Sequence, residues 1–272
     1  MLLRVNKLDW DKMGSFNSGK RLAIVSLVIV IILVSSGFYF VLSQPKSLAG
    51  VRVAVYDDNG TTAASQFALE AMFRWMGADV TVIGGDDVAG GALDSYDIFV
   101  APGGCWCDER CEILDDFEIV RQFILNGGSY FGIDGGASYA TSYRLGLFNG
   151  VLYADCNGSG DYLLEMNVNR DSTGPDLSDE PESYVLFYEA SGYFLADNMT
   201  GIIPICTYTD SGYAGMIAFK YGNGTVFLSS PHPEYEEGSL RDGTDFWDSD
   251  PDPDSEWSLM LKITDWLLEE SA

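Results

Sequence analysis

The chain has 272 residues, of which 47% are hydrophobic and 13% aromatic, and this apolar content argues against a disordered chain. A formal net charge of −26 would repel nucleic acid, which argues against a nucleic-acid-binding protein. The charge is unevenly distributed. Six basic and two acidic residues precede residue 47, so the remainder carries a formal charge of −30.

The first predicted element is a transmembrane helix over residues 22–42. These positions contain no charged side chain, and at about 1.5 Å per residue they span roughly 30 Å, the hydrocarbon thickness of a bilayer. Basic residues precede the span, so the positive-inside rule places residues 1–21 in the cytoplasm. A cleaved signal peptide is less favoured, because the apolar run exceeds the usual length of about 7–15 residues. We expect a single-pass cell-membrane protein with a linker at 43–50 and an extracytoplasmic domain at 51–272.

An extracytoplasmic domain could be glycosylated. Four Asn-x-Ser/Thr sequons fit that location, namely Asn59, Asn157, Asn198 and Asn223.

The five cysteines are expected to be largely oxidised outside the cell, with one left over. A first bridge is predicted inside the cluster, from Cys105 or Cys107 to Cys111, and a second between Cys156 and Cys206. The cluster could instead hold a metal. That alternative is less favoured, because neither a second Cys-x-x-Cys nor a histidine lies nearby in the sequence.

Strands alternate with helices through the first half of the domain. The pattern predicts strands at 51–56, 79–83, 97–101 and 129–133, with helices at 62–76, at 112–125 and after 134–136. This order predicts an α/β fold, a flavodoxin-like doubly wound and mostly parallel sheet with helices on both faces. Shorter strands follow at 162–168, 184–189, 216–221 and 225–229, before a closing helix at 255–270.

Three polar or glycine-rich segments directly follow predicted strands. They are Ala-Pro-Gly-Gly at 101–104, Gly-Ile-Asp-Gly-Gly at 132–136 and Ser-Pro-His-Pro-Glu at 230–234. Because a doubly wound sheet forms its site at the carboxyl ends of its strands, we expect these segments to meet there, with Asp134 within about 5 Å of His232.

In this order the three segments resemble the class I glutamine amidotransferase superfamily. They look most like the domain at the amino terminus of eukaryotic biotin–protein ligases. The resemblance implies a catalytic position at Asp134, an activating pair at His232 and Glu234, and oxyanion-type glycines at Gly103, Gly104 and Gly135. The superfamily has a nucleophilic cysteine where this chain has Asp134, and a carboxylate is a far poorer nucleophile toward an amide.

Several residues keep a second interpretation. Asp134 could simply cap the helix that follows it. Cys105 could be a relocated nucleophile with His232 as its base, although a disulfide is favoured. The acidic stretch 242–256 could bind Ca²⁺ weakly, although its prolines and the lack of an EF-hand glycine favour a solvated loop.

The sequence therefore predicts an amidotransferase-like extracytoplasmic domain without the cysteine nucleophile, which binds a small ligand or a surface protein and is not an active glutamine amidotransferase. One alternative is a diverged hydrolase that uses Asp134 or a water activated by His232. Another is a structural surface module with a vestigial pocket. No cofactor or metal is expected, and the membrane is the partner of residues 22–42.

Overall fold

The computed structural model describes residues 48–105, 117–141, 144–153, 160–189, 192–195, 199–250 and 254–271. All of them belong to the unit Pro45–Ala272. Within these described ranges, no helix has both the length and the apolar character needed to cross a bilayer. The predicted transmembrane segment, residues 22–42, lies outside them.

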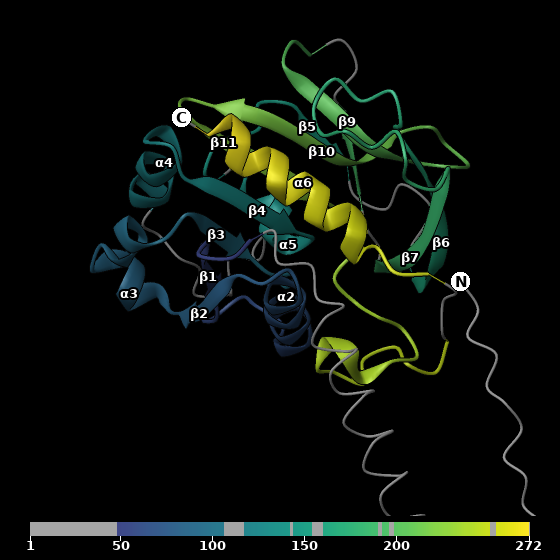
Figure 1. Cartoon of the computed structure of the whole chain (residues 1–272), viewed down its shortest axis with the longest axis horizontal. Helices are drawn as coiled ribbons and strands as arrows, with labels where there is room; N and C mark the ends of the chain where they lie inside the picture. The colour runs from purple at the N-terminus through teal and green to yellow at the C-terminus, as the bar shows by residue number, and fades with distance from the viewer. Residues whose placement is uncertain are drawn as a thin grey trace, which may run out of the picture. The chain divides into compact units, whose positions relative to one another are not determined.

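One half of the central sheet is parallel and has the order β2-β1-β3-β4-β11. Its strands are β1 (Arg52–Tyr56), β2 (Asp79–Ile83), β3 (Ile98–Ala101), β4 (Ser129–Ile133) and β11 (Gly224–Ser229). This order reverses between β1 and β3, as in flavodoxin-like folds, which bind ligands at such a switch point. The predicted flavodoxin-like fold is thus confirmed for this half (Figure 1).

The other half is antiparallel and continues from β11 in the order β10-β9-β6-β7. Its strands are β5 (Val151–Tyr153), β6 (Asp161–Val168), β7 (Ser183–Glu189), β8 (Tyr193–Leu195), β9 (Ile202–Tyr208) and β10 (Ala214–Tyr221). The short strands β5 and β8 pair with each other, and β8 also pairs with β10. The sheet is therefore mixed, with its parallel strands confined to one side.

Helices cover both faces of the sheet, and each face has its own core cluster. The helical elements are α2 (Ala63–Trp75), α3 (Gly85–Ala89), η2 (Ala92–Ser95), α4 (Phe117–Leu125), α5 (Gly135–Tyr139), η3 (Leu240–Asp242) and α6 (Trp257–Glu270). Helices α2 and α6 pack on one face, whereas α3, α4 and α5 pack on the other.

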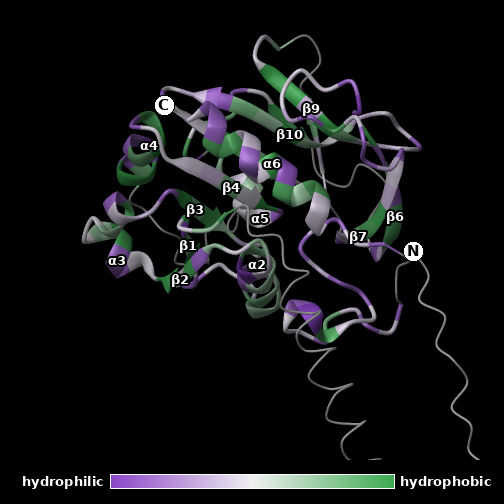
Figure 2. Ribbon diagram, in the orientation of Figure 1, coloured by the Kyte–Doolittle hydropathy of each residue, from purple (hydrophilic) through white to green (hydrophobic). Residues whose placement is uncertain are grey.

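Successive side chains along a strand point to opposite faces of the sheet, so each strand contributes to both core clusters. In β1, Val53 and Val55 point to the α2 and α6 face, and Ala54 and Tyr56 point to the opposite face. Figure 2 shows the matching pattern on α6, where hydrophobic and hydrophilic residues alternate around the helix.

One cysteine prediction is wrong. Cys206 lies on β9, fully buried in the core on the α2 and α6 face, and its thiol is free. The predicted bridge between Cys156 and Cys206 therefore does not form. Cys107, Cys111 and Cys156 lie outside the described residues, so a bridge within the Cys105 cluster stays a prediction.

Two carboxylates of the acidic stretch 242–256 accept hydrogen bonds from nearby backbone N–H groups. Asp242 accepts hydrogen bonds from the backbone N–H groups of Glu236 and Thr244, both at 3.1 Å, and Asp248 accepts one from Gly238 at 3.0 Å. Among the described residues, no group of His, Cys, Asp and Glu side chains is arranged to hold a metal ion.

Candidate functional site

Asp134 lies on a sharp turn between β4 and α5. Its backbone has φ 47° and ψ −109°, a conformation that is strained for any residue other than glycine. Two hydrogen bonds hold the turn, from Asp134 N–H to the Ser229 carbonyl at 2.8 Å and from Ser138 N–H to the Asp134 carbonyl at 2.9 Å. The prediction that a helix follows this segment is confirmed, since α5 begins at Gly135.

The Asp134 side chain does not cap this helix. No side-chain capping hydrogen bond is present at the start of α5, and instead Oδ2 of Asp134 accepts the backbone N–H of Gly104 at 3.0 Å. Burial raises the pKa of this carboxyl, while His232 and the N–H groups of Gly104 and Gly135 act in the opposite direction. The capping interpretation is therefore replaced by a contact between the turn after β4 and the turn after β3.

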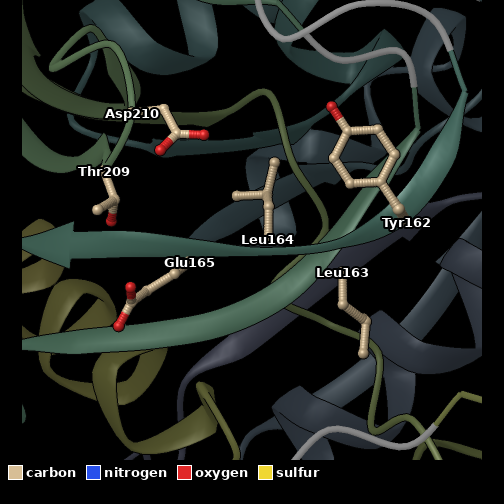
Figure 3. Close-up of a pocket in the computed structure, with 6 residues that line it drawn as sticks. All are labelled: Tyr162, Leu163, Leu164, Glu165, Thr209 and Asp210. Atoms are coloured by element: carbon tan, nitrogen blue, oxygen red, sulfur yellow. The ribbon is translucent and has the colours of Figure 1, made fainter.

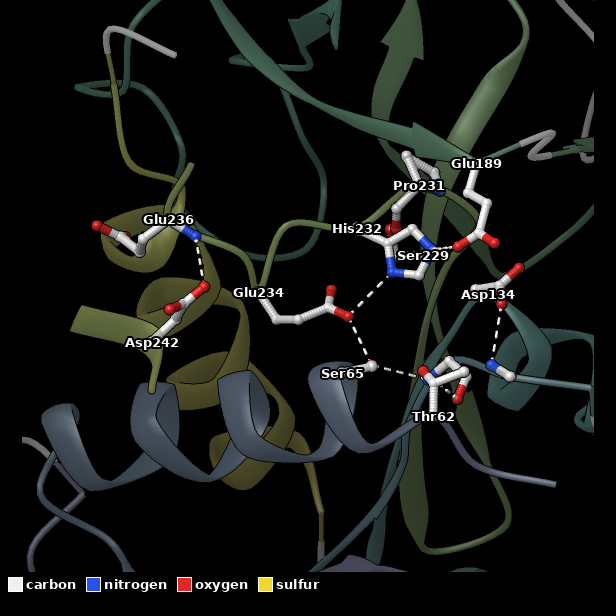
Figure 4. Close-up of polar contacts among 12 residues, drawn as sticks. Thr62, Ser65, Asp134, Glu189, Ser229, Pro231, His232, Glu234, Glu236 and Asp242 are labelled. Carbon is white, nitrogen blue, oxygen red and sulfur yellow. Dashed lines mark hydrogen bonds and ion pairs between the residues drawn. The ribbon is translucent and has the colours of Figure 1, made fainter. Parts of the chain in front are cut away.

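His232 follows β11 and is almost completely buried, with 1% of its surface exposed. Its backbone N–H donates to the Phe187 carbonyl at 3.0 Å, and its Nδ1 lies 3.0 Å from Oε1 of Glu234. Tyr235 stacks on its ring at 5.2 Å between centroids. The predicted His-x-Glu pair is thus in contact (Figure 4).

Three carboxylates surround this single histidine. Burial lowers the pKa of His232, but Glu234, Asp134 and Glu189 outweigh that effect and raise it to about 9. His232 therefore carries a proton at neutral pH. As a cation it stabilises neighbouring negative charge, and it cannot act as a general base in this state.

Gly103 lies between the side chains of Asp134 and His232. A Cβ at this position would lie 2.9 Å from Cε1 of His232 and 3.4 Å from Oδ2 of Asp134. The two side chains therefore face the same point on the same side of the sheet, as the motif order predicts. The absence of a side chain at Gly103 keeps this space open.

Ser65 joins the parts of the site, although nothing in the sequence indicated it. Its hydroxyl donates to Oε1 of Glu234 at 2.6 Å and accepts the backbone N–H of Gly103 at 2.9 Å (Figure 4). Ser65 lies in the first turn of α2, after β1, so this network crosses the switch point between β1 and β3.

Glu189, at the end of β7, is the second residue that the sequence did not indicate. Its Oε2 lies 3.8 Å from Nε2 of His232, and 51% of its side chain is exposed. It comes from the antiparallel half of the sheet, whereas Asp134 and His232 follow parallel strands. Both halves thus contribute to one site.

Cys105 directly follows Gly104 and is exposed. Its sulfur is disulfide-bonded and is not a free thiol, so the structure does not support Cys105 as a relocated nucleophile.

A separate pocket of about 340 Å³ lies over the first half of β6 (Figure 3). It is lined by Tyr162, Leu163, Leu164, Glu165, Thr209 and Asp210. None of the residues predicted from the motifs lines it. Glu165 also accepts a hydrogen bond from Ser183 at 2.6 Å, so part of its polar lining is already paired within the protein.

Solved structures with this fold include a glutamine amidotransferase from Thermotoga maritima, with a TM-score of 0.53, 17% identity, and coverage of 81% of this chain and 90% of the other. They also include a cytoplasmic protein from Salmonella typhimurium LT2, with a TM-score of 0.50, 10% identity, and coverage of 80% and 99%. No family model matches the sequence, and no curated protein matches it. At these identities the likeness concerns the fold alone: the chain has a glutamine-amidotransferase-like fold.

Proposed function

We propose that this chain is a membrane-anchored, extracytoplasmic binding domain that uses the Asp134–His232 site to hold a ligand without catalysing a reaction on it. Its nearest family would be the domain at the amino terminus of biotin–protein ligases, as the three motifs suggest. The observation that carries the proposal is the hydrogen bond from Gly104 N–H to the Asp134 carboxylate at 3.0 Å.

That hydrogen bond removes a group that acyl transfer needs. An oxyanion hole works because its N–H donors are free to meet the charge that develops on the substrate oxygen. Here the carboxylate of Asp134 already takes the Gly104 donor, and it would have to be displaced first. His232 is also protonated at neutral pH, because its pKa is raised to about 9 by the carboxylates around it. Both features oppose an amidotransferase reaction.

We expect the purified full-length protein to release no ammonia from glutamine above the uncatalysed background. The reason is the missing thiol at the elbow. An ammonia-release assay at pH 7 to 8 checks this, with His232→Ala as the matched control. Ammonia release by the wild type that disappears in His232→Ala would contradict the proposal.

Asp134→Cys provides a sharper test of the same site. The new thiol would sit on the strained turn and be stabilised as a thiolate by the His232 cation, so we expect fast alkylation by iodoacetamide at residue 134. Peptide mapping by mass spectrometry measures the rate against that of buried Cys206 in the same protein. Equal, slow rates at both cysteines would mean that the turn does not present its side chain to solvent.

A diverged hydrolase is the second candidate, favoured by the strained backbone of Asp134. Strain of this kind, about 1–3 kcal/mol, is often found at catalytic residues. In that case Asp134 or a water would attack the substrate, and loss of turnover in Asp134→Asn would identify it. The occupied Gly104 donor argues for the binding domain first.

The proposed membrane anchor is based on residues 22–42, and the proposed extracytoplasmic location is supported by the cysteines. Because Cys206 is a free buried thiol, four cysteines remain, an even number that could form two bridges. Of the four sequons, Asn59 and Asn223 lie on exposed turns and could accept a glycan.

Thiol labelling tests this location in protein taken from its native membrane. Under denaturing, non-reducing conditions we expect Cys206 to be labelled, and Cys105, Cys107 and Cys111 to be largely protected by oxidation. The same labelling after reduction is the control. Five reactive thiols before reduction would contradict an oxidising compartment.

A further inference from the structure

The charges at the Asp134–His232 site are arranged with the cation inside and the anions outside. His232 is buried, whereas Asp134 is partly exposed and half of the Glu189 side chain is exposed. Glu234, the third carboxylate, is fully buried behind the ring. A ligand arriving from solvent therefore meets two carboxylates before it meets the imidazolium.

The second ring nitrogen of His232, Nε2, lacks a hydrogen-bond partner. Its Nδ1 is paired with Glu234, but its Nε2 is buried and has no hydrogen-bond partner, since Oε2 of Glu189 lies 3.8 Å away, beyond hydrogen-bonding distance. In the protonated ring this buried N–H lacks an acceptor, and in a ring that has lost its Nε2 proton the bare nitrogen lacks a donor, so a ligand that supplies the positive charge and an N–H can replace the proton. In Figure 4, Nε2 faces the same side as the carboxylates of Asp134 and Glu189.

We infer that this site binds a primary ammonium group, whose three N–H donors meet the carboxylates of Asp134 and Glu189 and the Nε2 atom of a deprotonated His232. The inference rests on the proposed function and names the ligand class of that site. On binding, the ring gives its Nε2 proton to solvent, so the ammonium replaces that proton as the cation among the carboxylates. Glu189 only has to rotate, because its side chain is half exposed.

Other ligand classes fit these groups less well. An anion would have to approach the partly exposed carboxylate of Asp134 and the half-exposed carboxylate of Glu189, on a domain of strongly negative charge. A quaternary ammonium has no N–H to donate to Nε2. Among the described residues, these side chains do not form a group arranged for a metal ion. A primary ammonium supplies both the charge and the donors.

The exchange of one cation for another makes binding depend on pH. The groups that face His232 are Glu234 on its own segment, Tyr235 stacked on its ring, Asp134 after β4 and Glu189 at the end of β7. The pKa of His232 is about 9, so the ring is protonated at pH 7.5 and binding of the ammonium releases close to one proton. The affinity should then rise about tenfold for each pH unit between 7 and 8.5.

Isothermal titration of the full-length protein in nanodiscs with n-butylammonium tests this inference. Titrations in two buffers of different ionisation enthalpy count the protons released. Tetramethylammonium at equal ionic strength is the ligand control. An acetylated, amidated lysine separates a free amine from the side chain of a peptide: binding of butylammonium alone indicates a small amine, and binding of both indicates a lysine side chain as well. Either result supports the inference.

Glu189→Gln is the main variant, because a half-exposed side chain can be changed without loss of the fold. We expect it to weaken butylammonium binding at least tenfold, and Asp134→Asn to do the same. Glu182→Gln is the matched control. Glu182 also belongs to the β6–β7 region, is 91% exposed and lies 3.9 Å from Arg170, and its substitution should leave binding unchanged.

Three results would overturn the inference. They are equal binding of butylammonium and tetramethylammonium, equal weakening by Glu182→Gln and Glu189→Gln, and no binding of either amine at millimolar concentration. The first two would indicate general attraction of cations to an acidic surface. None of these bears on the glutamine assay, which decides the proposed function separately.

Discussion

Gly136→Ala is expected to destabilise the domain by about 3 kcal/mol or more, a large part of the stability of a typical domain. A Cβ at Gly136 would lie 2.1 Å from the carbonyl oxygen of Ala101 and 2.7 Å from its carbonyl carbon. The backbone of β3 cannot yield as a flexible side chain would, so the turn that carries Asp134 would have to move. Urea unfolding followed by far-UV circular dichroism measures the change.

Gly84→Ala is the control for this substitution. Its Cβ would make ordinary contacts, 3.4 Å from Oδ2 of Asp58 and 3.8 Å from the Asp57 carbonyl, and its φ of −102° suits any residue. We expect a change below about 1 kcal/mol. Similar losses for both variants would mean that the close approach of α5 to β3 does not limit stability.

Part of the fold could be predicted from the local sequence. Strand β4 has the predicted bounds, 129–133, because most of its residues are apolar, all are buried, and glycines follow at its sharp turn. The helix at 62–76 was also predicted to within one residue at each end, since Thr62 precedes a periodic apolar run. In these segments, local preference and burial act in the same direction.

Strand β9 was not predicted, and Pro204 is one physical reason. Proline removes a backbone donor, so its presence argues against a strand inside a sheet. Here the register with β10 shifts between the pairs Met216–Cys206 and Ile217–Pro204, and this irregularity accommodates the proline. The shift depends on the neighbouring strand, so it leaves no signal in residues 202–208 themselves.

The site also contains residues that the sequence predicted and residues that it did not. Asp134, His232 and Gly103 follow strands in recognisable motifs, and the parallel topology brings them together. Ser65 contacts Glu234 across 169 positions of sequence. Glu189 reaches His232 because a backbone bridge between Phe187 and His232 holds the end of β7 beside the site. A helical serine and a strand-end glutamate are common, so their roles appear only in the folded chain.

The second large effect concerns pH, and it also tests the electrostatics of the site. The pKa of His232 is about 9 in the fold and about 6.5 in an unfolded chain. The fold thus binds this proton more tightly, and the resulting stabilisation, about 3 kcal/mol, is complete below about pH 6.5 and lost as the pH rises through 9. We expect the unfolding free energy to fall accordingly between pH 6.5 and 9.5.

His232→Gln isolates this contribution, because His232 is the only histidine in the chain. Cys206 acts in the same direction above about pH 8, since its thiol ionises near 8.5 when unfolded while burial raises its pKa in the fold. That effect is common to both proteins and cancels in their difference. The advantage of the wild type over His232→Gln should therefore be constant below pH 6.5 and shrink steadily up to pH 9.5. A difference that stayed constant over that range would mean that the three carboxylates do not hold a proton on His232, and the arrangement of a buried cation behind accessible anions would have to be abandoned.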